Sequence, residues 1–207
     1  MRLAAVLLAA ASVVVAAGAA KAQVPVKIGV LNDQSGLYAD LGGQGSVWAA
    51  KKAVEDFGAA AKGLKVDVIF ADHQNKADVG TSIARQWYDV DGVDVILDVP
   101  NSGVALAVSG VTKEKNKVFI NSGAATSDLT GKACTPNTVH WTYDTWALAN
   151  GTGKAIVKTG GDTWFFLTAD YAFGHALERD TSKVVALANS GGDTINSVKQ
   201  AAEFGLS

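Results

Sequence analysis

Residues 26–31, VKIGVL, form a short apolar run that leads directly into NDQSG at residues 32–36, a cluster of turn-forming residues. A short apolar run bounded by turn signals is typical of a buried β-strand. Small and apolar residues then recur at helical spacing over residues 41–61, and Gly63 marks the end of that helix. Because buried strands that alternate with helices form parallel sheets, this opening predicts an α/β fold.

The same alternation continues along the chain as far as residue 121. The further elements expected here are a strand at 65–71, a helix at 79–88, a strand at 94–99, a helix at 104–114 and a strand at 117–121. Three successive strand-helix units predict a parallel sheet with helices on both faces.

The alternation is interrupted by a polar stretch at residues 122–136 and then resumes. The elements expected after it are an extended segment at 138–143, a helix at 146–158, a strand at 163–168, a helix at 172–188 and a strand at 194–198. The interruption predicts a domain boundary near residues 142–145, with a first lobe at residues 23–142 and the start of a second α/β lobe at residues 143–207. So short a second lobe would leave the edge of its sheet unpaired, so we expect it to be incomplete.

The first 22 residues have the organisation of a secretory signal peptide. Arg2 is followed by an uncharged apolar run, and Ala20-Lys21-Ala22 fits the small-residue pattern of a cleavage site. The alternative is a membrane anchor, but the run is rich in Ala and Val and is close to the lower limit of about 17 residues for a spanning helix. No cysteine lies near the cleavage site and no later run is long enough to span a bilayer. We therefore expect an exported chain without membrane insertion.

The charge balance excludes some classes of partner. The full chain has 18 basic and 20 acidic residues, and removal of Arg2 and Lys21 with the signal peptide leaves a net charge of about −4. Binding to nucleic acids or anionic membranes needs clustered Lys and Arg, so this balance argues against both. The lone Cys134 cannot form a disulfide within the chain, so stability must come from a hydrophobic core.

The sequence contains no complete signature of a catalytic, nucleotide or metal site. The glycines at residues 42–45 do not fit the dinucleotide fingerprint, and GTGK at residues 151–154 lacks the first glycine and the final Ser or Thr of a phosphate loop. His73, His140 and His175 are far apart in the sequence and have no second histidine or cysteine three or four positions away. We therefore expect a protein that is not an enzyme and that has no metal and no cofactor.

Two loops that follow expected strands carry hydrogen-bond donors. The first is PNSG at residues 100–103, and the second is NSGAAT at residues 121–126. Ligands of parallel α/β sheets bind beyond the carboxyl ends of the strands, where the start of a helix favours an anion. Asn101, Ser102, Ala124 and Thr126 are therefore candidates to hold one carboxylate. The alternative for Ser102 is an ordinary helix cap, worth about 1 kcal/mol.

Seven segments together carry a resemblance to a known family. They are VKIGV (26–30), SG (35–36), DLG (40–42), ADHQ (71–74), VDVI (93–96), FINSGAAT (119–126) and DYAFG (170–174). Their order and spacing resemble the periplasmic solute-binding proteins of the branched-chain amino acid ABC transporter type, which have the type I periplasmic binding protein fold. The resemblance extends over essentially the whole chain after residue 22.

The resemblance implies a role for several residues. The residues that would hold the carboxylate of the ligand are Ser102, Ala124 and Thr126. Tyr171 would close over the ligand from the second lobe, and Tyr38 or Leu41 would pack against the ligand's side chain.

The sequence departs from the amino acid binders at Trp141-Thr142, where many relatives have an Arg-Thr pair. Trp141 lies between His140 and Thr142, with Tyr143 close by, and this aromatic entrance resembles members that bind aromatic carboxylates. Offset stacking of two rings adds about 0.5–1.5 kcal/mol to burial. We expect an aromatic acid as the ligand, with a branched-chain or other amino acid second. The alternative for Trp141 is packing of the crossover strand.

The resemblance also implies a cellular role. The chain would be the substrate-binding component of an ABC transporter in the periplasm, with the membrane permease as its partner. Family members are longer, so the resemblance implies a C-terminally truncated form. Two alternatives stay open, namely a non-functional fragment of such a receptor and an extracytoplasmic ligand sensor on the same fold.

Overall fold

The computed structural model describes residues 23–188 of the chain. The elements in chain order are β1 (Val24–Asn32), α1 (Gly43–Phe57), a 3-10 helix (Ala59–Lys62), β2 (Leu64–Asp72), α2 (Ala77–Gln86), a π-helical turn (Trp87–Asp91), β3 (Val95–Asp98), α3 (Ser102–Glu114), β4 (Val118–Asn121), a 3-10 helix (Ser127–Leu129), β5 (Thr138–His140), α4 (Thr145–Leu148), a π-helical turn (Ala149–Gly153), α5 (Lys154–Lys158) and α6 (Ala172–Ala188).

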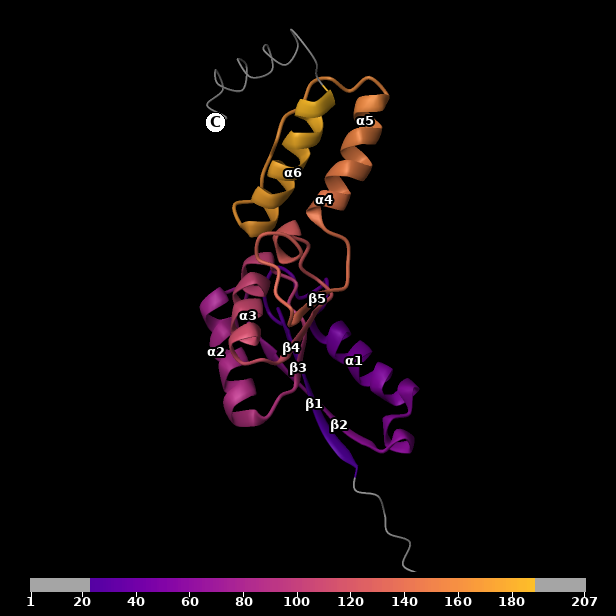
Figure 1. Ribbon diagram of the computed structural model, residues 1–207, viewed down its shortest axis with the longest axis vertical. Helices are drawn as coiled ribbons and strands as arrows, with labels where there is room; N and C mark the ends of the chain where they lie inside the picture. The colour runs from indigo at the N-terminus through magenta and orange to yellow at the C-terminus, as the bar shows by residue number, and fades with distance from the viewer. Residues whose placement is uncertain (1–22, 189–207) are drawn as a thin grey trace, which may run out of the picture.

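The strands form one parallel sheet in the order β2-β1-β3-β4-β5. Helix α1 covers one face of this sheet, and α2 and α3 cover the other (Figure 1). Helices α4, α5 and α6 lie together beyond the carboxyl ends of the strands (Figure 1). The parallel α/β architecture predicted from the sequence is therefore confirmed.

The hydrophobic core lies between the sheet and the layer formed by α2 and α3. Ile96 and Phe119 are fully buried on the central strands, and Val104 and Val108 of α3 pack against the same core. Burial of such apolar side chains stabilises the fold by roughly 1.5–3 kcal/mol each. The other face is covered less completely, because the buried residues of α1 are only Gly43 and Val47.

Two predicted helices differ in detail from the observed ones. The helix predicted at 41–61 is divided at Gly58, whose φ of 65° is a left-handed value that ends α1. The helix predicted at 146–158 is formed by α4, a π-helical turn and α5 in direct succession. Hydrophobic spacing predicted where these helices lie but not where each one is interrupted.

The strand predicted at residues 163–168 is wrong for this structure, in which the segment has no regular secondary structure. Its side chains still alternate as in a strand, because Trp164 and Phe166 are half-buried while Phe165 and Leu167 are 83% and 94% exposed. A strand also needs a neighbour for its hydrogen bonds. Within residues 23–188 the segment pairs with no strand. The strand predicted at 194–198 lies outside the described residues.

Among residues 23–188, no helix combines the length and the apolar character needed to cross a membrane.

Candidate functional site

The candidate site lies at the carboxyl ends of β1, β3 and β4. Asp98 ends β3 opposite Leu31 of β1 and Asn121 of β4, and Asn121 in turn lies opposite His140 of β5. In the sheet, β2 lies on one side of β1 and β3 lies on the other side. The direction in which successive strands are added therefore reverses between β1 and β3. Ligands of open α/β sheets bind outside such a reversal.

The loop after β3 begins α3 with a capped turn. The Asn101 side chain accepts hydrogen bonds from the backbone N–H groups of Gly103 at 2.9 Å and Val104 at 3.2 Å. The residue that caps the helix is therefore Asn101 rather than Ser102. Ser102 is the first residue of α3, and its hydroxyl accepts a hydrogen bond from the backbone N–H of Thr126 at 3.3 Å.

The loop after β4 places Ala124 and Thr126 beside that helix start. The carbonyl of Ala124 accepts a hydrogen bond from His140 Nε2 at 2.7 Å. The hydroxyl of Thr126 accepts one from the backbone N–H of Asp128 at 3.3 Å and so caps the short helix at Ser127–Leu129. Ala124, Thr126 and the neighbouring Ser102 are all fully buried. The structure thus brings the predicted carboxylate-binding residues together and covers them.

Tyr38 and Tyr171 meet above this edge of the sheet. Their hydroxyl oxygens are 2.5 Å apart and their ring centroids are 6.4 Å apart. Phe173 extends the cluster, with its ring centroid 5.9 Å from that of Tyr171. Burial raises the pKa of Tyr171, and the hydrogen bond with Tyr38 raises it further, so the phenol stays protonated at neutral pH.

Asp33 holds the loop that carries Tyr38. Its carboxylate accepts hydrogen bonds from the backbone N–H groups of Gly36 and Tyr38, each at 2.8 Å, and from the side chain of Asn75. Burial alone would raise the pKa of Asp33, but these hydrogen bonds outweigh it and the pKa lies below its usual value. The anionic side chain therefore fixes the position of Tyr38.

Leu41 and Trp141 lie apart from these buried residues, on the surface. Leu41 is 77% exposed and Trp141 is 76% exposed. The backbone N–H of Trp141 donates to the carbonyl of Asn121 at 2.8 Å, so the residue follows the end of β5 while its indole faces solvent. Of the predicted ligand residues, Leu41 and Trp141 are therefore exposed, whereas Ser102, Ala124 and Thr126 are buried.

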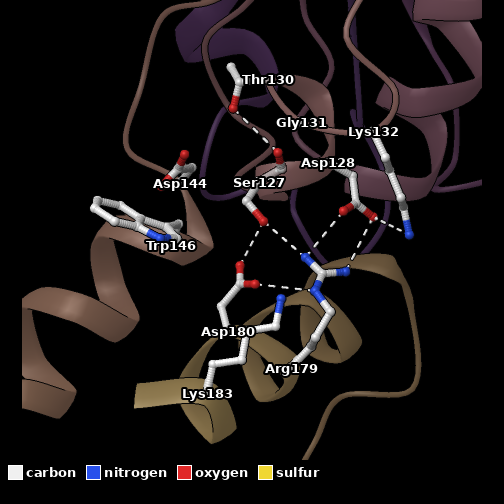
Figure 2. A pocket seen from close by; sticks show the side chains of 10 residues that line it. All are labelled: Ser127, Asp128, Thr130, Gly131, Lys132, Asp144, Trp146, Arg179, Asp180 and Lys183. Atoms are coloured by element: carbon white, nitrogen blue, oxygen red, sulfur yellow. Dashed lines mark hydrogen bonds and ion pairs between the residues drawn. The ribbon is translucent and has the colours of Figure 1, made fainter. Parts of the chain in front are cut away.

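A hollow of about 560 Å³ lies beside the site, between the loop after β4 and α6. The residues that line it are Ser127, Asp128, Thr130, Gly131, Lys132, Asp144, Trp146, Arg179, Asp180 and Lys183. Figure 2 shows the Arg179 guanidinium between the carboxylates of Asp128 and Asp180. None of the residues predicted from the sequence lines this hollow.

Asp180 is the centre of the polar network in the hollow. Its carboxylate accepts hydrogen bonds from the hydroxyls of Ser127 at 2.6 Å and Thr145 at 2.7 Å, and from Arg179 Nε at 3.2 Å. Arg179 also pairs with Asp128 at 3.1 Å. Burial would raise the pKa of Asp180, but these donors outweigh it and the pKa is lowered. The network joins α6 to the loop after β4 and to the start of α4.

Sequence reasoning missed this network, and it also missed Asp98 at the end of β3. Arg179 and Asp180 are neighbours within a helical pattern, which is unremarkable in a solvent-exposed helix. Their partners lie 35 to 53 residues earlier in the chain. The one available signal was the pair Ser127-Asp128 in the polar stretch at 122–136, which gives no indication of its partner.

His73 is fully buried at the end of β2, next to this edge of the sheet. Its Nδ1 accepts a hydrogen bond from the backbone N–H of Asn75 at 3.0 Å, and its Nε2 has no partner within the described residues. Burial lowers the pKa of His73, although the charges of Asp33, Asp72 and Asp98 oppose the shift. The folded chain therefore holds His73 in its neutral form.

Acid is expected to destabilise the chain through His73. An unfolded histidine takes up a proton near its ordinary pKa of 6.5, whereas the folded one resists protonation until lower pH. The contribution of neutral His73 to the free energy of unfolding is complete above pH 6.5. It is lost as the pH falls from 6.5 through the lowered pKa. In that pH range the free energy of unfolding changes by up to about 1.4 kcal/mol per pH unit. Urea unfolding of the full chain at a series of pH values measures it.

His73→Asn retains an acceptor for the backbone but cannot titrate, so it is expected to flatten this slope. His175→Asn is the matched control, because it makes the same substitution at a side chain that is 60% exposed. An identical slope in His73→Asn and the parent chain would show that His73 is not the group responsible.

Within residues 23–188, no group of three or more His, Cys, Asp or Glu side chains is arranged to hold a metal ion.

Comparison with known proteins places this geometry in a family. The sequence profile of the periplasmic binding proteins matches residues 25–186. No curated protein matches the chain at a significant level. A periplasmic binding protein from Burkholderia mallei is 48% identical with a TM-score of 0.75, and the match covers 88% of this chain and 58% of that one.

Two further solved structures are similar. A branched-chain amino acid ABC transporter periplasmic ligand-binding protein from Burkholderia xenovorans is 33% identical with a TM-score of 0.70, over 87% of this chain and 58% of that one. A solute-binding protein of an ABC transporter from Rhodopseudomonas palustris, in complex with 3,4-dihydroxybenzoic acid, is 24% identical with a TM-score of 0.71, over 79% and 44% of the two chains. The last similarity shows the fold alone.

The chain spans 58% of the length of the first two of these relatives. The family profile covers most of the described residues, and both relatives are more than 30% identical to the chain over most of its length. The resemblance found in the sequence is therefore confirmed. The chain belongs to the periplasmic binding protein family, whose members bind solutes, and has the α/β architecture of its type I fold.

Proposed function

We propose that the chain is the substrate-binding component of an ABC transporter and captures a small carboxylate. The ligand would lie between a first lobe at residues 23–142 and a second lobe that begins at residue 143. The observation that carries this proposal is the contact between the Ser102 hydroxyl and the Thr126 backbone N–H at the start of α3. A hydroxyl, a backbone donor and the positive end of a helix converge there, and this combination suits a carboxylate.

The second lobe would supply the closing side of the site. Tyr171 precedes α6, and its hydroxyl reaches Tyr38, which belongs to the loop after β1. Domain closure around a ligand is a common motion of two-lobed proteins. In this proposal Tyr171 moves away from Tyr38 to admit the ligand, and the covered residues Ser102, Ala124 and Thr126 become accessible.

An aromatic acid is the ligand that we favour. Leu41 and Trp141 present exposed apolar surface, and Asn101 holds the start of α3 in place. A ring that stacked on Trp141 would gain about 0.5–1.5 kcal/mol beyond burial. The Rhodopseudomonas palustris protein indicates only that this fold can hold an aromatic acid. A branched-chain or other amino acid is the second choice, in keeping with the name of the Burkholderia xenovorans relative.

The location and the partner follow from this role. Residues 1–22 would act as a cleavable export signal, and the protein would work in the periplasm without catalysing a reaction. Its partner would be the membrane permease of the transporter. The family and the transporter relatives support these statements.

Titration calorimetry of the full chain with benzoate and with leucine tests the proposal. Ser102→Ala removes a hydroxyl from the carboxylate site and is expected to weaken binding about tenfold or more, since hydrogen bonds to charged groups contribute about 1.5–3 kcal/mol. Ser82→Ala makes the same chemical change on the exposed surface of α2 and should leave affinity unchanged. Equal affinities of the two variants would place the carboxylate elsewhere.

A further inference from the structure

Asp98, at the end of β3, has an unusual backbone. Its φ is 79° and that of the next residue, Val99, is 58°. Positive φ values are uncommon outside glycine, and they are unfavourable for a β-branched residue such as Val99. Both residues are buried, Asp98 being 6% exposed and Val99 0%. Strain of this kind persists only where the surroundings impose it, and it clusters at ligand sites.

The Asp98 carboxylate is buried without a cation. Oδ2 accepts a hydrogen bond from Asn32 Nδ2 at 3.0 Å, and Oδ1 accepts one from the Ser122 hydroxyl at 3.2 Å. Among residues 23–188, no ion pair includes Asp98. A carboxylate can accept about four hydrogen bonds. Asp98 therefore keeps unused acceptor capacity in a place where an unpaired charge is costly.

Two glycines allow the backbone to pack close to this carboxylate. A Cβ at Gly123 would lie 3.0 Å from Oδ1 of Asp98, and a Cβ at Gly42 would lie 3.3 Å from Oδ2. Any side chain at either position would crowd the acid. Asn32, which donates to Asp98, also donates to the carbonyl of Gly43 at 2.9 Å, so the loop after β1 is fixed around the same point.

Asp98 occupies the reversal of strand order between β1 and β3, where ligands of this class of fold bind. Ser102 follows it four positions later in the chain, and its partner Ser122 precedes Ala124 on the loop after β4. The acid therefore lies on the same two loops as the proposed carboxylate site. A fixed negative charge there disfavours a second anion and favours a hydrogen-bond donor.

We propose that Asp98 accepts a hydrogen bond from the ligand and selects carboxylates that carry a second, donating group. This inference rests on the proposed function, because it presumes that a carboxylate binds at the adjoining loops. The donor is an ammonium group or a phenolic hydroxyl, two groups with the same chemistry towards a carboxylate acceptor.

Two matched pairs of ligands test the inference by titration calorimetry of the full chain. Benzoate and 4-hydroxybenzoate differ by one phenolic hydroxyl, and 3-phenylpropionate and phenylalanine differ by one ammonium group. We expect the parent chain to bind the donor-bearing member of one pair about tenfold or more tightly than its partner. Asp98→Asn should abolish most of that preference and change the affinity for the donor-free member by about twofold or less. The pair in which the preference is lost identifies the donor.

Asp98→Asn is a suitable variant because Asn tolerates positive φ better than most residues and keeps an acceptor for Asn32. Urea unfolding of the variant checks that it is folded. Ser122→Ala is the control, since it removes a partner of Asp98 without removing the charge, and it should preserve the preference. Equal weakening of all ligands by Asp98→Asn would reduce Asp98 to a structural role and overturn the inference.

The other outcomes separate this inference from the function on which it rests. A parent chain that binds carboxylates with no preference in either pair overturns the inference alone. A folded parent chain that binds none of the four ligands overturns the proposed function and the inference together.

Discussion

Phe119→Ala is expected to lower the free energy of unfolding of the full chain by about 3–5 kcal/mol. Phe119 lies on β4, an interior strand of the sheet, and is fully buried in the core between the sheet and the layer of α2 and α3. Its removal leaves a cavity that the neighbouring side chains can fill only in part. Domains of this size are stable by about 5–15 kcal/mol in total, so the variant should unfold at a much lower urea concentration.

Phe165→Ala provides the control for this measurement. It is the same chemical change at a side chain that is 83% exposed, in the segment that forms no strand within the described residues. We expect a change of about 0.5 kcal/mol or less in the free energy of unfolding. If the two variants were equally destabilised, Phe119 would not occupy the core described here.

Asp180→Ala is expected to lower the free energy of unfolding by about 3 kcal/mol. Asp180 is 5% exposed, and its loss leaves the hydroxyls of Ser127 and Thr145 without their acceptor and Arg179 with one carboxylate fewer. Because these donors belong to the loop after β4, to α4 and to α6, the loss separates elements that the network joins. Urea unfolding of the full chain measures the change.

Asp170→Ala is the matched control, since the side chain of Asp170 is 99% exposed and pairs only with His175 among the described residues. An exposed pair of this kind contributes about 0–1 kcal/mol. Asp180→Asn keeps one acceptor oxygen and should fall between the control and the alanine variant. A destabilisation by Asp180→Ala no larger than that of Asp170→Ala would contradict the network.

The sequence was sufficient to predict the sheet because each of its first four strands is a short run rich in apolar residues. Val26–Leu31 is such a run, and the observed β1 contains all of it. A parallel arrangement followed from the helices between the strands, which need a crossover to return the chain. The local sequence pattern was therefore enough to predict the fold of residues 23–140.

Periodicity could not decide whether residues 163–168 form a strand. The alternation of Trp164 and Phe166 with Phe165 and Leu167 is present in the structure, but strand formation depends on a partner elsewhere in the chain. The same limit applies to Asp180 and its partners, which come together only through the path of the chain. Contacts between distant residues have no local signature.

The candidate site was predictable where it depended on neighbouring strands. Ser102 and Thr126 follow β3 and β4, which are adjacent in the sheet, and they do form a hydrogen bond. Leu41 and Trp141 belong to loops whose course the pattern does not determine, and they lie exposed. Asp98 was missed because its positive φ, and its lack of an ion-pair partner among residues 23–188, are properties of the folded chain.

The capture of a carboxylate is tested most directly by titration calorimetry of the full chain with benzoate and with benzamide. The two ligands have the same ring and differ in the charge of the group that would meet the Ser102 hydroxyl and the Thr126 backbone N–H. The account predicts saturable binding of benzoate and binding of benzamide that is about tenfold weaker or absent. Equal binding of the two ligands, or no binding of benzoate to the folded chain, would contradict it.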